Sequence, residues 1–275
     1  MRSFYPLVLA ITFLSLLANA ALCDPTPAAE VTRSADSFKA EERLLRQVVA
    51  LTNAERAKLN LPPLKLHEKL CVAAQWLAQD MADHNYFEHT DHQGRSIDPR
   101  LPDFGYQDYE NLGENIAAGH STPEEVLADW MHSPDHRANL LDPQVREIGV
   151  GYAQSQDSKF KRYWVQDFGS RFDGFPLVIN DESGQTCAMC VKLTIYGETG
   201  AKKMRISNDG QTWTEWEPYK VQRDWVLPTG TGKHTVYVEV NNGKTTRRSD
   251  DTVELVEEPK TPIKTARQTM PKAAR

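Results

Sequence analysis

An apolar stripe in residues 67–85 restricts the fold of this chain more than any other feature of the sequence. Five small or aliphatic side chains recur there at the i, i+3, i+4, i+7 spacing of one helix face: Leu70, Ala73, Ala74, Leu77 and Met81. A helix with one apolar face buries that face against another element. The stripe therefore predicts a helix packed on a second layer, and a similar pattern predicts another helix from Asp36 to Asn60.

Helix and strand signals continue through the first two thirds of the chain. Residues 86–120 contain many glycines and prolines and are predicted to form a long irregular stretch, which in a compact domain is usually functional or disordered. Thr122 and Pro123 have the side chains of a helix start, and Ser133-Pro134 predicts a second, shorter helix. Residues 147–153 and 161–169 alternate as strands. This half is predicted to be α+β, with helices packed on a sheet.

The composition changes after Arg171. Short β-type runs follow, separated by turn sequences such as Asn208-Asp209-Gly210 and Asn241-Asn242-Gly243. Residues 173–258 are therefore predicted to form a small all-β sandwich, in which residues 212–216 are one strand. Trp213 and Trp216 are expected to pack in its core, with an aromatic binding platform as the alternative. Residues 259–275 are basic and poor in apolar side chains, and we predict a disordered tail.

The first residues have the pattern of a secretory signal peptide. Arg2 precedes an apolar run from residue 7 to residue 17, and Ala18-Asn19-Ala20 is a small-residue cleavage signal. We predict a signal peptide at residues 1–20, a linker at 21–36 and a secreted or periplasmic protein. The apolar run is too short to span a bilayer, and no later run is long enough, so no transmembrane segment is expected after cleavage.

Charge and cysteine content narrow the classes of function. The formal net charge of -6 argues against a nucleic-acid-binding protein, which needs a basic face. Export permits disulfides, and the C-x-x-C spacing of Cys187 and Cys190 predicts a local one. Cys71 falls within a helical apolar pattern and is expected to be an inert, buried thiol.

Six of the eight histidines lie between His84 and His136. The chain has no H-E-x-x-H helix and no G-x-S-x-G turn, so neither a zincin nor an α/β-hydrolase is indicated. Four of these histidines lack a recognisable pattern and are expected to be solvated: His84, His92, His120 and His132.

Four segments, taken in order, resemble the CAP superfamily of cysteine-rich secretory, antigen 5 and pathogenesis-related 1 proteins. They are YFEHT at 86–90, GENI at 113–116, WMHSPDHRANL at 130–140 and EIGVG at 147–151. The resemblance is closest to the short, cysteine-poor bacterial branch. It implies an α-β-α sandwich with a central cleft over residues 37–172. The following β-domain, residues 173–258, resembles a bacterial immunoglobulin-like repeat.

The resemblance also implies which side chains face the cleft. His89, Glu114 and His136 match three of the family's four cleft positions. The fourth, a glutamate three residues after the helix tryptophan, is Ser133 here, and Ser133 is better explained as a helix N-cap. Asp129, Asp135 or Glu110 could supply the missing carboxylate, and the sequence does not select among them.

Two imidazoles and a carboxylate are a reasonable ligand set for a divalent ion such as zinc. We therefore predict an exported binding protein whose His89, Glu114 and His136 hold a divalent metal, whose cleft takes a small apolar or lipid-like ligand, or both. The partner would be such a ligand or a component of the cell envelope. One alternative is a metal-dependent hydrolase of peptidase type, in which the two histidines hold the metal and Glu114 activates water. Another is a non-catalytic envelope adhesion protein.

Overall fold

A computed structural model of the protein describes residues 35–258, with side chains described from residue 42 onward. The predicted signal peptide, nearly all of the predicted linker and the predicted basic tail lie outside the described residues.

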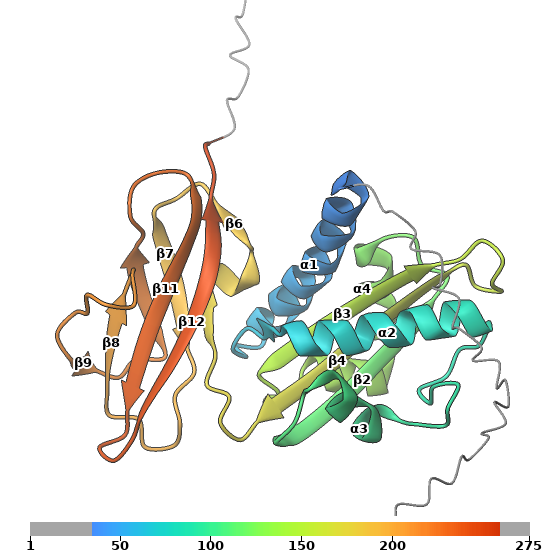
Figure 1. Ribbon diagram of the computed structural model, residues 1–275, viewed down its shortest axis with the longest axis horizontal. Helices are drawn as coiled ribbons and strands as arrows, with labels where there is room; N and C mark the ends of the chain where they lie inside the picture. The colour runs from blue at the N-terminus through green and yellow to red at the C-terminus, as the bar shows by residue number, and fades with distance from the viewer. Residues whose placement is uncertain (1–34, 259–275) are drawn as a thin grey trace, which may run out of the picture.

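The first part of the chain forms three layers around one sheet (Figure 1). The sheet has four strands in the order β1 (Lys65–Leu66), β3 (Glu147–Gln154), β4 (Arg162–Arg171) and β2 (Tyr109–Ala118). β4 is antiparallel to both of its neighbours. The helix α2 (Glu68–His84) packs on one face, and α1 (Ala35–Lys58), α4 (Pro123–His132) and α5 (Pro134–Leu140) pack on the other. The predicted α+β arrangement of helices on a sheet is confirmed.

Two glycines of β3 allow α2 to lie directly against the sheet. A Cβ added to Gly149 would lie 2.1 Å from the backbone of Leu70, and one added to Gly151 would lie 2.3 Å from the backbone of Ala74. Both distances are shorter than any stable carbon contact. The alternation of glycine with Ile148 and Val150 thus sets a flat face toward α2 and an apolar face toward α1.

The prediction of an irregular stretch over residues 86–120 was wrong. The structure has the short helices α3 (Ile97–Arg100) and η1 (Leu101–Phe104) there, followed by the ten-residue strand β2. The first half of β2 contains polar residues and Gly113, so it lacks the alternating apolar pattern from which a strand is predicted. A Cβ at Gly113 would lie 3.2 Å from Oδ1 of Asn139, a tight contact, so glycine gives the Asn139 side chain room against β2.

The helix starts were predicted more accurately. Thr122 accepts a hydrogen bond from the backbone N–H of Glu125 at 3.2 Å, which confirms it as the N-cap of α4. Ser133 occupies the N-cap position of α5, but its side chain makes no capping hydrogen bond.

The second part of the chain contains two sheets that share one apolar core. The smaller has the order β10-β7-β5 and the larger the order β6-β12-β11-β8-β9. Their bounds are β5 (Leu177–Ile179), β6 (Gln185–Thr186), β7 (Cys190–Ile195), β8 (Lys203–Ser207), β9 (Glu217–Pro218), β10 (Gln222–Val226), β11 (Gly232–Asn241) and β12 (Thr246–Leu255). Aliphatic side chains from both sheets form the core. An immunoglobulin-like assignment stays a prediction.

Residues 212–216 were predicted to form a strand, and this was wrong. Trp213 and Trp216 instead both contact Arg205, whose guanidinium carbon is 4.9 and 4.8 Å from the two ring centres. Both rings are only partly buried and lie outside the apolar core of this part of the chain, so the prediction that they pack in that core was wrong. The aromatic binding platform stays an alternative.

The two parts of the chain are joined by buried polar contacts. Lys65 of β1 pairs with Glu182 at 2.8 Å and with Asp251, and Tyr196 donates to the carbonyl of Pro63 at 2.9 Å. Glu182 belongs to the short helix η2 (Asn180–Glu182), which follows β5. Within residues 35–258, no helix has the length and apolar character needed to cross a membrane.

Candidate functional site

The candidate site lies at β2, the edge strand of the first sheet. Nδ1 of His89, from the loop after α2, is 2.8 Å from Oε1 of Glu114 in β2. Glu114 is only 7% exposed, whereas the side chain of His89 is 53% exposed. Because the carboxylate accepts, Nδ1 carries the proton and Nε2 has the free lone pair. The imidazole is therefore oriented by Glu114 and open to a ligand on its other edge.

Arg100 holds the second oxygen of the same carboxylate. Its guanidinium contacts Oε2 of Glu114, and the Arg100 side chain is fully buried. Arg100 also reaches the backbone carbonyl of His89 at 3.4 Å. One buried arginine thus fixes both the carboxylate and the loop that carries the histidine.

A second buried acid completes this group. Asp167 of β4 lies directly opposite Glu114 in the antiparallel register and is fully buried. Burial, together with the neighbouring Glu114 carboxylate, raises the pKa of Asp167 well above its ordinary value. Neither oxygen of Asp167 has a hydrogen-bond partner among the described residues, so no donor stabilises its charged form.

His136 approaches this group from α5. Burial lowers its pKa, and the neighbouring His89 ring lowers it further, so the neutral ring is favoured. Its Nδ1 atom is buried without a hydrogen-bond partner among the described residues. The structure therefore brings His136 into the electrostatic reach of His89.

Glu114 was predicted to bind a metal ion together with His89 and His136. In the described part of the chain, the ligand atoms of His89, Glu114 and His136 do not all lie within 4.8 Å of one another. Both oxygens of Glu114 are instead bonded to His89 and Arg100. In this structure Glu114 therefore orients a histidine, and its role as a metal ligand stays a prediction.

A chain of buried amides ties α5 to the sheet. Asn139 donates to the backbone carbonyl of Glu114 at 3.1 Å and to the side chain of Asn115 at 2.9 Å. Asn115 in turn donates to the backbone carbonyl of His136 at 3.1 Å. These hydrogen bonds hold α5 against β2 and so fix the position of His136 relative to Glu114.

The side chains considered for the missing carboxylate have other partners. Asp129 pairs with His120 at 3.1 Å, and Glu110 lies 3.5 Å from Arg146. Asp129 and Asp135 both act electrostatically on His136, whose pKa they raise against the larger effect of burial. Ser133 stands at the turn between α4 and α5. None of these contacts rebuilds a fourth cleft ligand.

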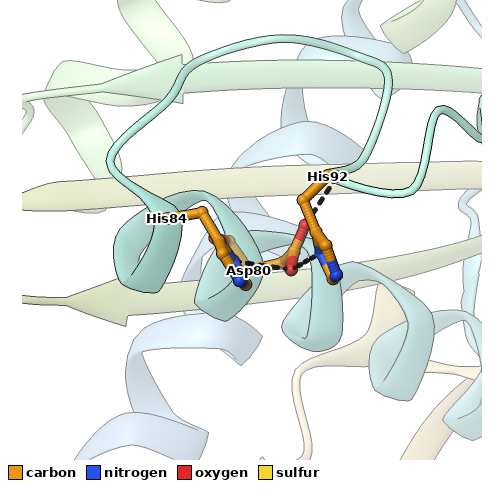
Figure 2. A group of neighbouring side chains, drawn as sticks. All are labelled: Asp80, His84 and His92. Atoms are coloured by element: carbon orange, nitrogen blue, oxygen red, sulfur yellow. Dashed lines mark hydrogen bonds and ion pairs between the residues drawn. The ribbon is translucent and has the colours of Figure 1, made fainter.

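A separate group of ligand-type side chains lies at the end of α2 (Figure 2). His84 and His92 both direct Nδ1 toward Oδ1 of Asp80, and their rings stack with centres 4.1 Å apart. The ligand atoms of all three residues lie within 4.8 Å of one another, so this group could hold a metal ion. His84 and His92 were expected to be solvated, and both are exposed, but both also contact Asp80. In the sequence, the only sign of this group was Asp80, an acid among the apolar residues that α2 buries.

The cysteines contribute no ligand to either group. Cys187 and Cys190 are exposed and free, and the disulfide predicted between them stays a prediction. Cys71 is also free, and burial raises the pKa of its thiol to about 11, which agrees with an inert thiol.

A three-layer α-β-α domain with paired histidines and a buried glutamate at the sheet edge defines the class of protein. Residues 49–168 match the model of the CAP family, the cysteine-rich secretory protein family. Residues 49–168 therefore form a CAP domain, similar to that of a bacterial relative.

Two relatives from Bacillus subtilis are similar to the same part of the chain. The uncharacterized protein YkwD is 45% identical over 123 residues, which are 45% of this chain and 46% of the relative. The uncharacterized membrane protein YlbC is 30% identical over 127 residues, which are 46% of this chain and 34% of the relative. The chain thus spans less than half the length of either curated relative.

Solved structures are similar over the same region. An extracellular protein containing a SCP domain from Bacillus anthracis has 32% identity and a TM-score of 0.45, over 50% of this chain and 44% of that chain. An outer surface protein from Borrelia burgdorferi has 23% identity and a TM-score of 0.43, over 48% of this chain and 94% of that chain.

Proposed function

We propose that this chain is an exported CAP-domain protein that binds a divalent metal ion, zinc foremost, through His89 and His136. It acts by binding rather than by catalysis. In this proposal residues 37–172 form the metal-binding domain, and residues 173–258 form an immunoglobulin-like domain that attaches or spaces it. Export rests on the charged, apolar and small-residue order of residues 1–20.

The hydrogen bond from His89 to Glu114 is the observation that carries the proposal. Metal-binding histidines commonly donate their second ring N–H to a carboxylate, which selects the tautomer and raises the basicity of the ligand atom. The 2.8 Å contact between Nδ1 of His89 and Glu114 gives His89 this arrangement, and about half of the His89 side chain is exposed. His136, whose lowered pKa favours the neutral ring, supplies a second imidazole in the protonation state that a metal requires.

The same geometry gives no support to the hydrolase alternative. A general base must reach the proton of a bound water, directly or through one other water. Both oxygens of Glu114 are already bonded, and the side chain is only 4% exposed. Glu114 is therefore a poor activator of water in this structure.

Two cavities among the described residues have walls that do not favour an apolar ligand. These cavities, of about 630 and 330 Å³, lie where the two parts of the chain meet, and their walls are mainly polar and charged. A lipid-like ligand and envelope adhesion are the alternatives to metal binding, and neither has a comparable observation in its favour.

Zinc titration of the metal-free full chain tests the proposal. The variant His89→Ala/His136→Ala should lose one bound zinc ion relative to the wild type. Glu114→Gln should keep that ion with an affinity about 10–100-fold lower, since a carboxylate that orients a ligand typically contributes this much. His132→Ala is the matched control, because His132 bonds only locally to the carbonyl of Ala128 at 2.5 Å.

An unchanged zinc stoichiometry in His89→Ala/His136→Ala would refute the metal site. Hydrolysis of peptides or esters by the zinc-loaded wild type, lost in Glu114→Gln, would establish the enzymatic alternative. Lipid recovered by organic extraction of the native protein would establish the apolar-ligand alternative.

A further inference from the structure

Asp80, His84 and His92 form a second group of ligand-type side chains, apart from the site at β2. Asp80 and His84 are one turn apart on α2, and His92 comes from the loop that follows. Nδ1 of His84 is 3.0 Å from Oδ1 of Asp80, and Nδ1 of His92 contacts the same oxygen. Figure 2 shows both rings directed at this one carboxylate.

The Asp80 carboxylate is oriented by hydrogen bonds to the oxygen that does not face the two histidines. Its other oxygen, Oδ2, accepts from the hydroxyl of Tyr86 and, at 3.1 Å, from the backbone N–H of His92. The Asp80 side chain is only 4% exposed, so these bonds fix its direction and leave Oδ1 for the two rings. Outer contacts of this kind are typical of metal ligands.

The spacing of the three donors suits a small transition-metal ion. Zinc takes imidazole nitrogen and carboxylate oxygen at about 2.0–2.2 Å, so donors around one tetrahedral ion lie about 3.3 Å apart. The donor atoms here are already within 4.8 Å of one another. The side chains of His84 and His92 are 50% and 35% exposed, which leaves room for water to complete the coordination.

We propose that Asp80, His84 and His92 bind a zinc-type divalent ion that fastens the loop of residues 86–96 to the end of α2. Two nitrogens and one oxygen favour zinc over calcium, which prefers oxygen ligands alone. The loop also carries His89, so an ion here holds in place the segment that presents His89 to Glu114. The binding site itself does not depend on the proposed function of His89 and His136.

A stoichiometric zinc titration tests this site. The protein is the full chain with Cys187→Ser and Cys190→Ser, because two exposed thiols would bind zinc themselves. In this background His84→Ala/His92→Ala should lose one zinc ion, whereas His89→Ala/His136→Ala should keep that ion. His234→Ala is the control, because this histidine of β11 bonds to the carbonyl of Gly230, far from either group in sequence.

The pattern of losses separates this proposal from the function proposed above. If only His84→Ala/His92→Ala lowers the stoichiometry, the second site stands and the site at His89 fails; the reverse pattern overturns the second site alone. Equal stoichiometry in His84→Ala/His92→Ala and the parent protein also overturns it.

Tyr86→Phe keeps all three ligands and provides a second measurement. Loss of its hydroxyl contact with Asp80 should weaken zinc binding about 10–100-fold. Circular dichroism in the presence of a chelator should be the same as for the parent protein. Unchanged zinc affinity in a folded Tyr86→Phe protein would count against the proposed orientation of Asp80.

Discussion

The charge balance around Arg100 leads to a prediction about two neighbouring carboxyls. Arg100 is fully buried and contacts Glu114, while the opposed Asp167 is held neutral by burial and by Glu114. Removing one partner of a buried ion pair costs about 3–5 kcal/mol, because a buried charge is left without compensation. In Glu114→Gln, however, Asp167 no longer faces a carboxylate and can ionise beside Arg100.

The loss of stability in Glu114→Gln should therefore be less than about 3 kcal/mol at pH 7. Asp167→Asn should be as stable as the wild type or more so, since it removes an acid that must stay protonated in the folded state. The double variant leaves Arg100 without any carboxylate and should lose about 3–5 kcal/mol. The two substitutions are thus expected to be strongly non-additive.

Urea unfolding followed by circular dichroism measures these free energies, provided that the m-value is unchanged. Glu110→Gln is the matched control on the same strand, because Glu110 is exposed and should change stability by no more than about 0.5 kcal/mol. If the changes in unfolding free energy of Glu114→Gln and Asp167→Asn simply add in the double variant, Asp167 does not replace Glu114 as the charged partner of Arg100, and the reasoning is refuted.

The pH dependence of stability provides an independent check on Asp167. Its raised pKa means that the folded chain keeps a proton that the unfolded chain releases above about pH 3.9. The favourable contribution of this proton is complete below that pH and is lost as the pH rises toward the folded pKa. Asp167→Asn should remove this part of the decline, and a profile parallel to that of the wild type would contradict the assignment.

Three further predictions concern the frame around the site. Gly149→Ala should cost about 1–3 kcal/mol, since its Cβ would lie 2.1 Å from the backbone of α2 and neither backbone can yield easily. Gly174→Ala, with a nearest contact of 3.3 Å, is its control in thermal melts, and equal effects would contradict the close-packing argument. Thr122→Ala should cost about 1 kcal/mol through loss of the cap of α4; a change below about 0.3 kcal/mol in urea unfolding would argue against it. Burial raises the pKa of Glu182 to about 7 from 4.5, so its proton stabilises the folded state below pH 4.5, and this contribution is lost by about pH 7. Glu182→Gln should flatten that interval of the profile, and an unchanged slope there would disprove the shift.

Local patterns were sufficient to predict much of the fold. The stripe of α2 and the alternation of glycine with Ile148 and Val150 each specify an element and the face that it buries. Thr122 marks the start of α4 by a hydrogen bond made within four residues. Each of these patterns involves residues that are close in sequence, so the corresponding helix or strand can be predicted from the sequence alone.

The strand β2 could not be predicted in the same way. Its residues 110–115 are mostly polar or glycine, and their partners come from distant segments: Arg100 for Glu114, and Asn139 for the face of Gly113. The charged strand β12 also contains a residue whose partner is distant in sequence, since Asp251 pairs with Lys65.

The sequence supplied candidate residues for the site but not their contacts. His89 and Glu114 were both candidates, but the contacts of Glu114 with Arg100 and its position opposite Asp167 come from segments that no local pattern connects to it. Asp167 left one sign of its importance, as an acid next to Gln166 in an otherwise apolar strand. Asp80 is likewise an acid among the apolar residues of α2. A buried acid in an apolar run marks a polar group whose partners only the fold can supply.

Lys65 has a consequence for any attempt to separate the two parts of the chain. Although burial opposes its charge, Glu182 and Asp251 raise the pKa of Lys65 above its ordinary value, so the ammonium is present at the junction. A fragment that stops at residue 172 would lack both carboxylates and also Tyr196. The charge of Lys65 would then be left without its buried partners, so we expect such a fragment to be less stable than the same residues in the full chain.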